Sequence, residues 1–358
     1  DLIAFTGRYQ RDTLEIESFN YLWGDSELTR KLLDALLYRC LYHLLCIHTA
    51  NYKYGFVGGF EQSLVLVIEK SQFIKDISDL SHISDLDKIK TFLEFLEFPT
   101  DFEKAKNADA ALQPLFVHQE SYFIPCFHII ESNLERNLMT LLARNESKLF
   151  DKQSKKFEEK MVSKIEEKLL GKLYKKNYKK RINKKDQEFD FLLIDEKNKK
   201  VLIIELRWMI QPADPREVIQ KTKACMEKVE KIKQKKEFFL ENISEFAKDL
   251  ELPLLHEYSV DGIVVIDGYS GCFTEDLTIP LVPMEIFNIA LKKSKDFKSL
   301  YQSLCTLKWL PQENIHFKFS SYTLDNKEGI FHVPAIELLD GYAKNYLKSL
   351  DSFFLEYE

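Results

Sequence analysis

The sequence contains no stretch of about 18 consecutive apolar residues, the length that a membrane-spanning helix requires. No secretory signal peptide is visible either. The six cysteines are scattered, and no two of them form a C-x-x-C pair, which argues against a disulfide-stapled scaffold. We therefore expect reduced thiols, a cytoplasmic location and no membrane association.

The chain as a whole also lacks an excess of positive charge, because its formal net charge is −6. Overall composition therefore gives no indication of nucleic-acid binding. The charge is uneven, however. Residues 151–185 hold 14 basic and 5 acidic residues, a local excess of +9, and the rest of the chain carries −15. A basic segment of this kind predicts a local surface for an acidic partner.

The length of 358 residues and the 45% hydrophobic content predict a globular mixed α/β (α+β) protein of two or three domains. Residues 1–150 are predicted to form a mainly helical N-terminal domain. Residues 151–280 are predicted to mix helices with buried strands, and residues 281–358 to form a small α+β extension packing on that core. Because the chain starts at Asp1 rather than Met, we expect it to be a fragment with further domains on the N-terminal side. A protein partner and a homo-oligomer are separate expectations.

The middle part is predicted to follow the order helix, strand, strand, strand, helix, strand. The first helix, around 154–172, is indicated by an apolar stripe at every fourth position, formed by Phe157, Met161, Ile165 and Leu169. A second, long helix is predicted to begin near Pro215, with Asp214 as its N-cap. Further along, we expect a helix near 284–305, a hairpin with "DNKEG" between its strands, and a final helix over 336–350.

The stretch "QEFDFLLIDEKNKKVLIIELRW" (187–208) predicts two buried strands, and each carries one acid, Asp190 and Glu205. A buried carboxylate costs several kcal/mol unless it is compensated. If the turn is centred between Lys197 and Asn198, Asp190 lies directly opposite Glu205, with α-carbons about 4.5–5.5 Å apart. A divalent cation, Mg²⁺ or Mn²⁺, would relieve their repulsion. The alternative is that both acids are strand-end charges, satisfied by Arg207 or a lysine.

Asp190, followed fourteen residues later by Glu205-Leu206-Arg207 in this order of elements, resembles the PD-(D/E)xK restriction-endonuclease-like nuclease superfamily. The segment "KFEEKMVSKIEEKLL" resembles the helix that opens that core, where a Phe-Glu pair often supplies an auxiliary acid. The resemblance covers about 150–270 and implies a restriction-endonuclease-like αβββαβ core. It also implies that Asp190 and Glu205 bind the metal with help from Glu158, and that Arg207 holds the position of the catalytic lysine.

Arginine in place of that lysine is a departure from the family pattern. A guanidinium can stabilise charge on a phosphate, but it stays protonated and cannot act as a base. Three alternatives follow: Arg207 supports cleavage, a lysine from the next helix such as Lys221 or Lys223 replaces it, or the nuclease fold binds without cutting. In the last case the ligand would be nucleic acid or a protein partner.

The lysine-rich stretch before Asp190 is predicted to hold a phosphate backbone, most simply DNA, with RNA as the alternative. Tyr174 and Tyr178 lie within it and would stack on bases or pack beneath the lysines. Gln220 and Lys221, on the predicted long helix, would help to bind the phosphate. The complete basic set is Lys175, Lys176, Lys179, Lys180, Arg181, Lys184 and Lys185.

The sequence thus predicts a metal-dependent nuclease that hydrolyses nucleic-acid phosphodiesters, as either an endonuclease or an exonuclease. The resemblance implies a role in restriction or anti-phage defence. The alternative is a catalytically inactive protein of the same fold. A solvated lysine-rich face with no ligand is the simplest competing interpretation of the basic stretch.

Overall fold

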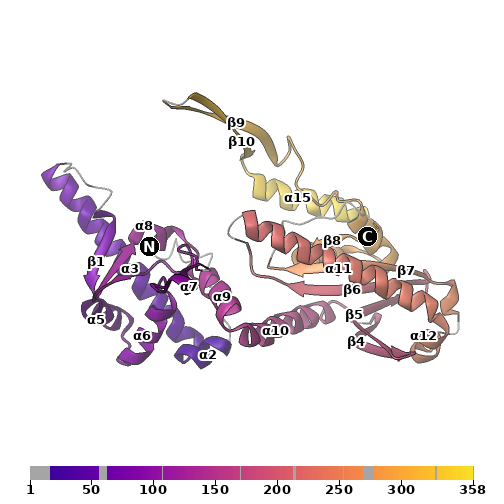
Figure 1. Ribbon diagram of the computed structural model, residues 1–358. Coiled ribbons are helices and arrows are strands. Elements are labelled where there is room, and N and C mark those ends of the chain that lie inside the picture. The colour runs from indigo at the N-terminus through magenta and orange to yellow at the C-terminus, as the bar shows by residue number, and fades with distance from the viewer. Residues whose placement is uncertain are drawn as a thin grey trace. The chain divides into compact units, whose positions relative to one another are not determined.

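The computed structural model describes residues 17–55, 63–106, 108–169, 171–212, 215–252, 254–268, 278–326 and 329–357. The chain divides into two compact units, Asp1–Lys156 and Phe157–Glu358, which follow one another along the colour ramp of Figure 1. No helix in the described ranges is long and apolar enough to cross a membrane.

The first unit is mainly helical. Its longest helix, α3 (Ser26–Tyr54), begins where the Asp25 carboxylate accepts a hydrogen bond from the Leu28 N–H, and it ends at Gly55 with φ of 82°. A small antiparallel sheet has the order β1 (Val65–Glu69), β3 (Ser121–Pro125), β2 (Phe116–His118). The other described helices are α2 (Glu17–Trp23), α5 (Lys70–Ser81), α6 (Leu86–Phe95), α7 (Phe102–Ala105), α8 (Cys126–Glu131) and α9 (Leu134–Asn145).

The second unit is built on a five-stranded mixed sheet with the order β4-β5-β6-β7-β8. The first three strands pair antiparallel, and the last three pair parallel. The strands are β4 (Leu173–Ile182), β5 (Lys185–Asp195), β6 (Lys200–Trp208), β7 (Ser259–Asp267) and β8 (Leu281–Pro283). The predicted mixed α/β class is therefore confirmed. Residues 281–283, which we expected to open a C-terminal extension, form the edge strand of this sheet.

The predicted order of elements is found. Helix α10 (Ser147–Glu166) precedes β4, β5 and β6, and α11 (Pro215–Glu241) connects β6 to the parallel strand β7. Asp214, the expected N-cap of α11, lies outside the described residues. A short helix, α12 (Ile243–Leu250), and a 3-10 turn, η1 (Leu255–Glu257), extend the crossover beyond the prediction.

The predicted register of the β5–β6 hairpin is also found. Phe191 pairs with Ile204 and Leu192 with Ile203, which centres the turn between Lys197 and Asn198. A one-residue slip would have turned the apolar residues of one strand to the wrong face. The same register places Asp190 and Glu205 one position beyond the last pair that the two strands form.

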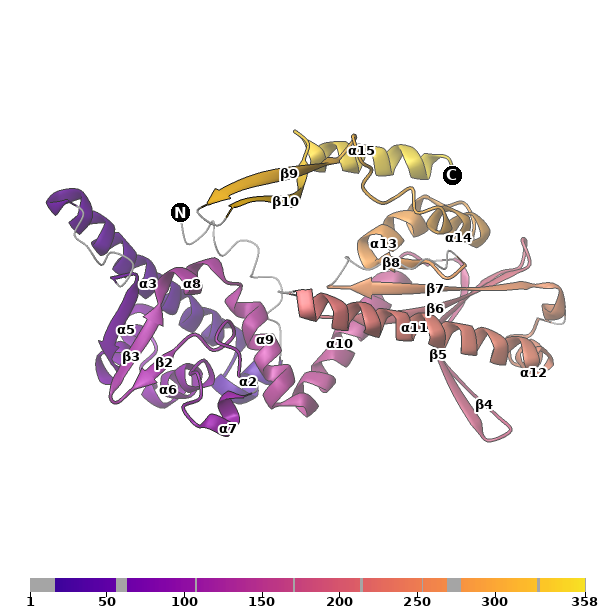
Figure 2. The same cartoon turned by 45° about the horizontal axis from the view of Figure 1, so that its top comes forward.

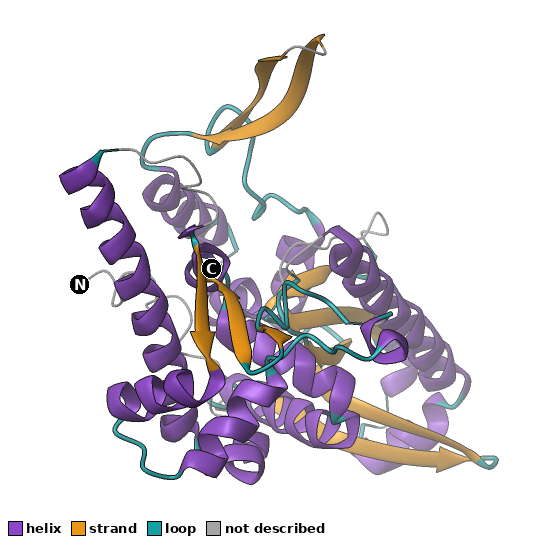
Figure 3. Cartoon of the chain, turned by 60° about the vertical axis from the view of Figure 1, so that its left-hand side comes forward, coloured by secondary structure: helices purple, strands orange, loops and turns teal. Residues whose placement is uncertain are grey.

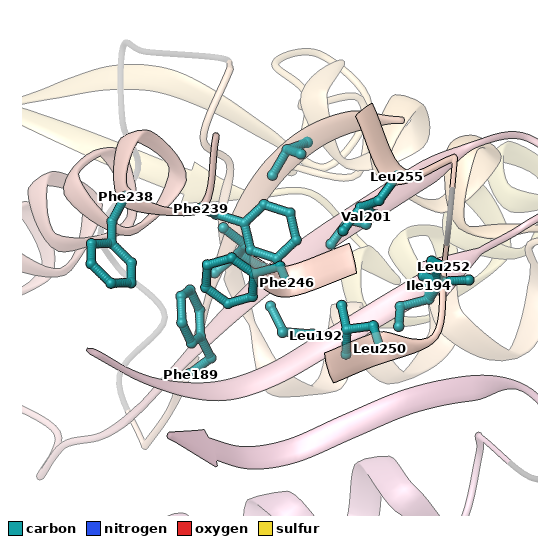
Figure 4. Close-up of a cluster of buried hydrophobic side chains, with 12 residues drawn as sticks. Phe189, Leu192, Ile194, Val201, Phe238, Phe239, Phe246, Leu250, Leu252 and Leu255 are labelled. Atoms are coloured by element: carbon teal, nitrogen blue, oxygen red, sulfur yellow. The ribbon is translucent and has the colours of Figure 1, made fainter. Parts of the chain in front are cut away.

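Helices cover both faces of the sheet. Odd-numbered residues of β6, such as Val201 and Ile203, face α11 and α12, where they pack in one buried cluster with Phe239 and Phe246 (Figure 4). On the opposite face Trp208 stacks on Phe157 of α10, with ring centroids 4.3 Å apart. Helix α14 (Phe297–Cys305) contacts β5 and β6 on that second face as well.

One glycine allows α11 to approach the sheet closely. Figure 2 shows α11 running along β6 and β7. A Cβ atom added at Gly262 in β7 would lie 2.1 Å from Cγ2 of Ile232 in α11. Any larger residue at position 262 must therefore displace the helix or this isoleucine.

The β4–β5 hairpin changes face halfway along its length. Tyr174 donates to Glu166 of α10 at 3.0 Å, whereas Tyr178, four residues later, donates to Asp249 of α12 at 2.8 Å. Strict alternation would place both tyrosines on one face. The change occurs at Asn177, which has a φ of 45° and lies opposite Asp190 in the register, where no pair is formed. The side chains of β4 and β5 therefore change from one face of the sheet to the other at the level of Asp190.

The C-terminal part corrects two expectations. The single helix expected near 284–305 is two helices, α13 (Met284–Lys293) and α14, because the Asp296 carboxylate caps a new helix start by accepting from Ser299 N–H. The predicted hairpin is present as β9 (Phe317–Asn326) and β10 (Gly329–Leu338). The last helix, α15 (Tyr342–Leu355), starts six residues later than predicted, because Ile336 and Leu338 belong to β10.

Candidate active site

Asp190 lies where the β5–β6 ladder ends. The last pair on this side is Phe191 with Ile204, and the carboxylate of Asp190 accepts a hydrogen bond from the backbone N–H of Leu206 at 2.7 Å. Asp190 and Glu205 are therefore not a backbone pair, although their register positions are opposite. The side chain of Asp190 reaches across to β6 beside Glu205.

The pKa of Asp190 is raised from 3.8 to about 6, first by burial and then by the negative charge of Glu205. The Leu206 N–H and the ammonium groups of Lys228 and Lys235 oppose this rise without cancelling it. The two predicted acids thus interact electrostatically, as expected of neighbouring carboxylates.

Glu205 is only 2% exposed, and two lysines of α11 compensate its charge. Lys228 Nζ lies 3.3 Å from its Oε2, and Lys235 Nζ contacts its Oε1. The exposed side-chain fractions of these lysines are 17% and 12%. The alternative expectation was that Arg207 or a lysine satisfies these acids. For Glu205 the partners are two lysines of α11, whereas Arg207 pairs with Glu158.

Sequence reasoning proposed Lys221 or Lys223 as the lysine from the next helix and missed Lys228 and Lys235. The signal that identifies the correct pair is the apolar stripe of α11. Cys225, Val229 and Ile232 are buried against the sheet. Lys228 lies three positions after Cys225, and Lys235 lies three positions after Ile232. On a helix, residues three apart share a face.

Arg207 and Glu158 form a separate pair at the end of β6. Arg207 Nη1 lies 3.6 Å from Glu158 Oε1, and the same oxygen accepts from the Trp208 N–H at 3.5 Å. The Phe157–Trp208 stack positions this part of α10. The structure therefore brings Glu158 to the end of β6, where it contacts Arg207 and the Trp208 N–H; among the described residues it makes no contact with Asp190 or Glu205.

Most of the predicted basic set lies on β4, and four of its members are ion-paired. Their partners are Glu166 for Lys176 (2.7 Å), Glu188 for Lys179 (3.3 Å), Asp249 for Lys180 (2.6 Å) and Asp186 for Arg181 (3.6 Å). Within the described ranges, Lys175, Lys184 and Lys185 form no ion pair. The unpaired positive charge of this stretch is therefore smaller than the sequence suggests.

The two residues predicted on α11 lie in its first two turns. Gln220 is exposed and Lys221 is half-buried. They precede Lys228 by about two helical turns, so they belong to the end of α11 that lies before the lysine–Glu205 contacts. The structure does not bring them to the two acids.

A pocket of about 560 Å³ lies at the turn end of the β5–β6 hairpin, lined by Lys172, Leu173 and residues 194–198 and 295–297. Two of its three acids are already engaged. Asp195 accepts from the backbone N–H groups of Asn198 (3.0 Å) and Phe297 (3.1 Å), and Asp296 caps α14. This pocket is separate from the Asp190–Glu205 pair.

The chemistry available at the pair is that of two carboxylates beside two ammonium groups. No cluster of three or more His, Cys, Asp or Glu side chains suited to a metal occurs among the described residues. Comparisons with protein-family models, with curated proteins and with solved structures give no match. Function must therefore be argued from the geometry.

Proposed function

We propose that the unit Phe157–Glu358 is a restriction-endonuclease-like, metal-dependent nuclease domain that hydrolyses nucleic-acid phosphodiesters in the cytoplasm, with DNA as the first substrate to test. The observation that carries this proposal is the buried Glu205 beside the half-buried Asp190, with Lys228 and Lys235 paired to Glu205. A stable fold has little reason to take two acids and two lysines largely out of water together, because an apolar replacement is often no less stable.

Each side chain has a role in this proposal. Asp190 and Glu205 would hold a divalent cation, and Lys228 and Lys235 would bind the scissile phosphate in place of the lysine that the motif lacks. Ammonium groups held in a half-buried site stabilise a developing negative charge more strongly than exposed ones. Arg207, through Glu158, would position α10 at the end of β6.

The donor set fits Mg²⁺ or Mn²⁺, since Mg²⁺ is commonly held by one or two carboxylates together with water. The cation would supply Lewis acidity toward the phosphodiester. Glu205 already accepts from two lysines, so a cation would need at least one of them to move away. Lys228 and Lys235 end in flexible four-carbon chains that permit such a movement.

The test is cleavage of plasmid DNA and of single- and double-stranded DNA and RNA oligonucleotides with Mg²⁺ or Mn²⁺. We expect D190N and E205Q to lose cleavage. D186N, an exposed acid on the same strand, serves as the matched control and should cut normally. Equal activity in all three variants and the wild type would refute the site.

The complete pairing of Glu205 favours a second candidate, a nuclease fold that binds without cutting. Two lysines balance the charges of the two acids with no cation present. This candidate predicts that Mg²⁺ and Mn²⁺ do not bind in calorimetric titration and that DNA is retained but not cleaved. The variant R207K also distinguishes the two candidate functions. If R207K gains cleavage activity, the native chain is the non-cutting form of the fold.

A further inference from the structure

The β9–β10 hairpin exposes apolar side chains on both of its faces. In Figure 3 it is a two-stranded ribbon, and no third strand pairs with it in the described part of the chain. A two-stranded ribbon on its own is marginally stable in water. The exposed apolar members are Phe319, Tyr322, Leu324, Ile330, Phe331, Val333, Ile336 and Leu338.

One hydrogen bond shows which residues of β9 direct their backbone groups toward β10. Leu339 N–H donates to the carbonyl of His316 at 3.1 Å, in register with the hairpin. Backbone groups of even-numbered β9 residues therefore face β10, because inward and outward positions alternate along an antiparallel strand. Odd-numbered residues face outward, and the carbonyl of Phe317 accordingly accepts from Asn314 outside the ribbon.

The two outer edges of the ribbon differ. On β9 the outward N–H groups include those of Phe319, Ser321 and Thr323. On β10 the outward position opposite Ser321 is Pro334, which has no N–H to donate. A proline at this position prevents another strand from pairing with β10. The edge of β9 remains able to accept a strand.

We propose that the free edge of β9 pairs antiparallel with β9 of a second copy of this chain, forming a four-stranded sheet across a two-fold axis. A single open edge closes as a dimer, whereas two open edges would allow continued addition of copies. The geometry points to a copy because self-pairing centred on Ser321 places Phe319 opposite Thr323 of the second copy, twice by symmetry. Aromatic and β-branched residues are favourable cross-strand neighbours.

Charge supports a protein strand as the occupant. Among the described hairpin residues the charged ones are Lys318, Asp325 and Glu337, and Lys318 is paired with Glu337 at 3.1 Å. Nucleic acid would require an excess of positive charge. The self-pairing brings Lys318 opposite Leu324 of the second copy, so no like charges are opposed. The carbonyl of Phe317 is already occupied, so the free part of this edge begins at Lys318. It still gives the contact both an edge and two apolar faces.

The test is the mass of the full chain in solution, measured by sedimentation or light scattering between about 1 and 100 μM. We expect the wild type and S321A to be dimeric and S321P to be monomeric. A proline at position 321 removes an outward N–H only, and the opposite position already tolerates proline. P334T restores the missing donor of β10 and should produce assemblies larger than a dimer.

The fold of the S321P hairpin is checked by hydrogen exchange, since the amides of Tyr322 and Leu324 bond to β10 and should stay protected. If that protection is lost, T323P blocks the same edge at another outward position. A monomeric wild type, or a dimer that persists in both proline variants, would overturn the proposal. A dimeric P334T would overturn the role given to Pro334.

Discussion

The carboxylate of Asp190 accepts a hydrogen bond from the backbone N–H of Leu206, at 2.7 Å, just beyond the last pair of the β5–β6 ladder. The Asp190 side chain of β5 thus binds a backbone amide of β6, and this hydrogen bond fixes the position of the Asp190 carboxylate. Its neighbour Glu205 is fixed separately by α11. The two acids are positioned by different elements, so they can be perturbed one at a time.

The stability of the protein should depend on the charge of Asp190. Because its pKa is raised from 3.8 to about 6, the native state holds more protons than the unfolded state between these values, and stability falls as pH rises through this window. Relative to D190N, the wild type should lose about 1 kcal/mol between pH 5 and pH 8. Urea denaturation with EDTA at both pH values measures this difference. A constant difference would contradict the raised pKa.

The α11 lysines should matter for catalysis if the proposed nuclease activity is present. K228M and K235M each remove an ammonium group beside Glu205, and we expect cleavage to fall by about 10²-fold or more. K231M, an exposed position on the same helix, is the matched control. Single-turnover cleavage with radiolabelled DNA measures the rates. K228M and K235M that cut as fast as K231M would exclude these lysines from the site.

Lysines without an acidic partner should dominate nucleic-acid binding. The triple variant K175Q/K184Q/K185Q should weaken DNA binding and reduce the slope of log K against log salt by up to about 2.7 for duplex DNA. Fluorescence anisotropy at several salt concentrations measures the slope.

Variants of the ion-paired lysines provide the comparison for that series. K176Q/K180Q removes cations that already face Glu166 and Asp249, so its effect on the slope should be smaller. If both sets change the slope equally, or neither does, β4 is not a selective phosphate-binding surface.

Disturbing the close approach of α11 to the sheet should lower the free energy of unfolding. In G262A the new methyl group would lie 2.1 Å from Ile232 Cγ2, and we expect a loss of about 1–3 kcal/mol. I232A in the same chain removes the opposing atoms, so the double variant should be more stable than the sum of the single effects predicts. Urea denaturation of the four proteins measures this coupling. Simple additivity would show that the contact is not made.

Local sequence patterns were sufficient for the architecture around the two acids. The apolar alternation and the polar turn predicted the Phe191–Ile204 register, and the four-residue spacing predicted the buried face of α10, where Met161 and Ile165 are buried. The helix ends at Glu166, earlier than predicted, so the buried Leu169 lies just beyond it. These features depend on interactions between near neighbours along the chain. They need no knowledge of the long-range packing.

The details of the site depend on long-range packing, and the sequence left them open. Many lysines occur on α11, and only the contact of this helix with β6 selects Lys228 and Lys235. Asparagine tolerates a positive φ better than most residues, but the sequence alone does not show that Asn177 adopts a φ of 45°. The start of α15 was missed because the alternation of Ile336 and Leu338 competes with a helical period over the same residues.

The change of face in the β4–β5 hairpin has a consequence for how the second unit opens. One half of the hairpin is tied by Tyr174 and Lys176 to Glu166 of α10, and the other half by Tyr178 and Lys180 to Asp249 of α12. Helices on opposite faces of the sheet are therefore connected through a single continuous strand. Fraying of this hairpin would loosen both helices at once, so their amides should share one opening free energy in native-state hydrogen exchange.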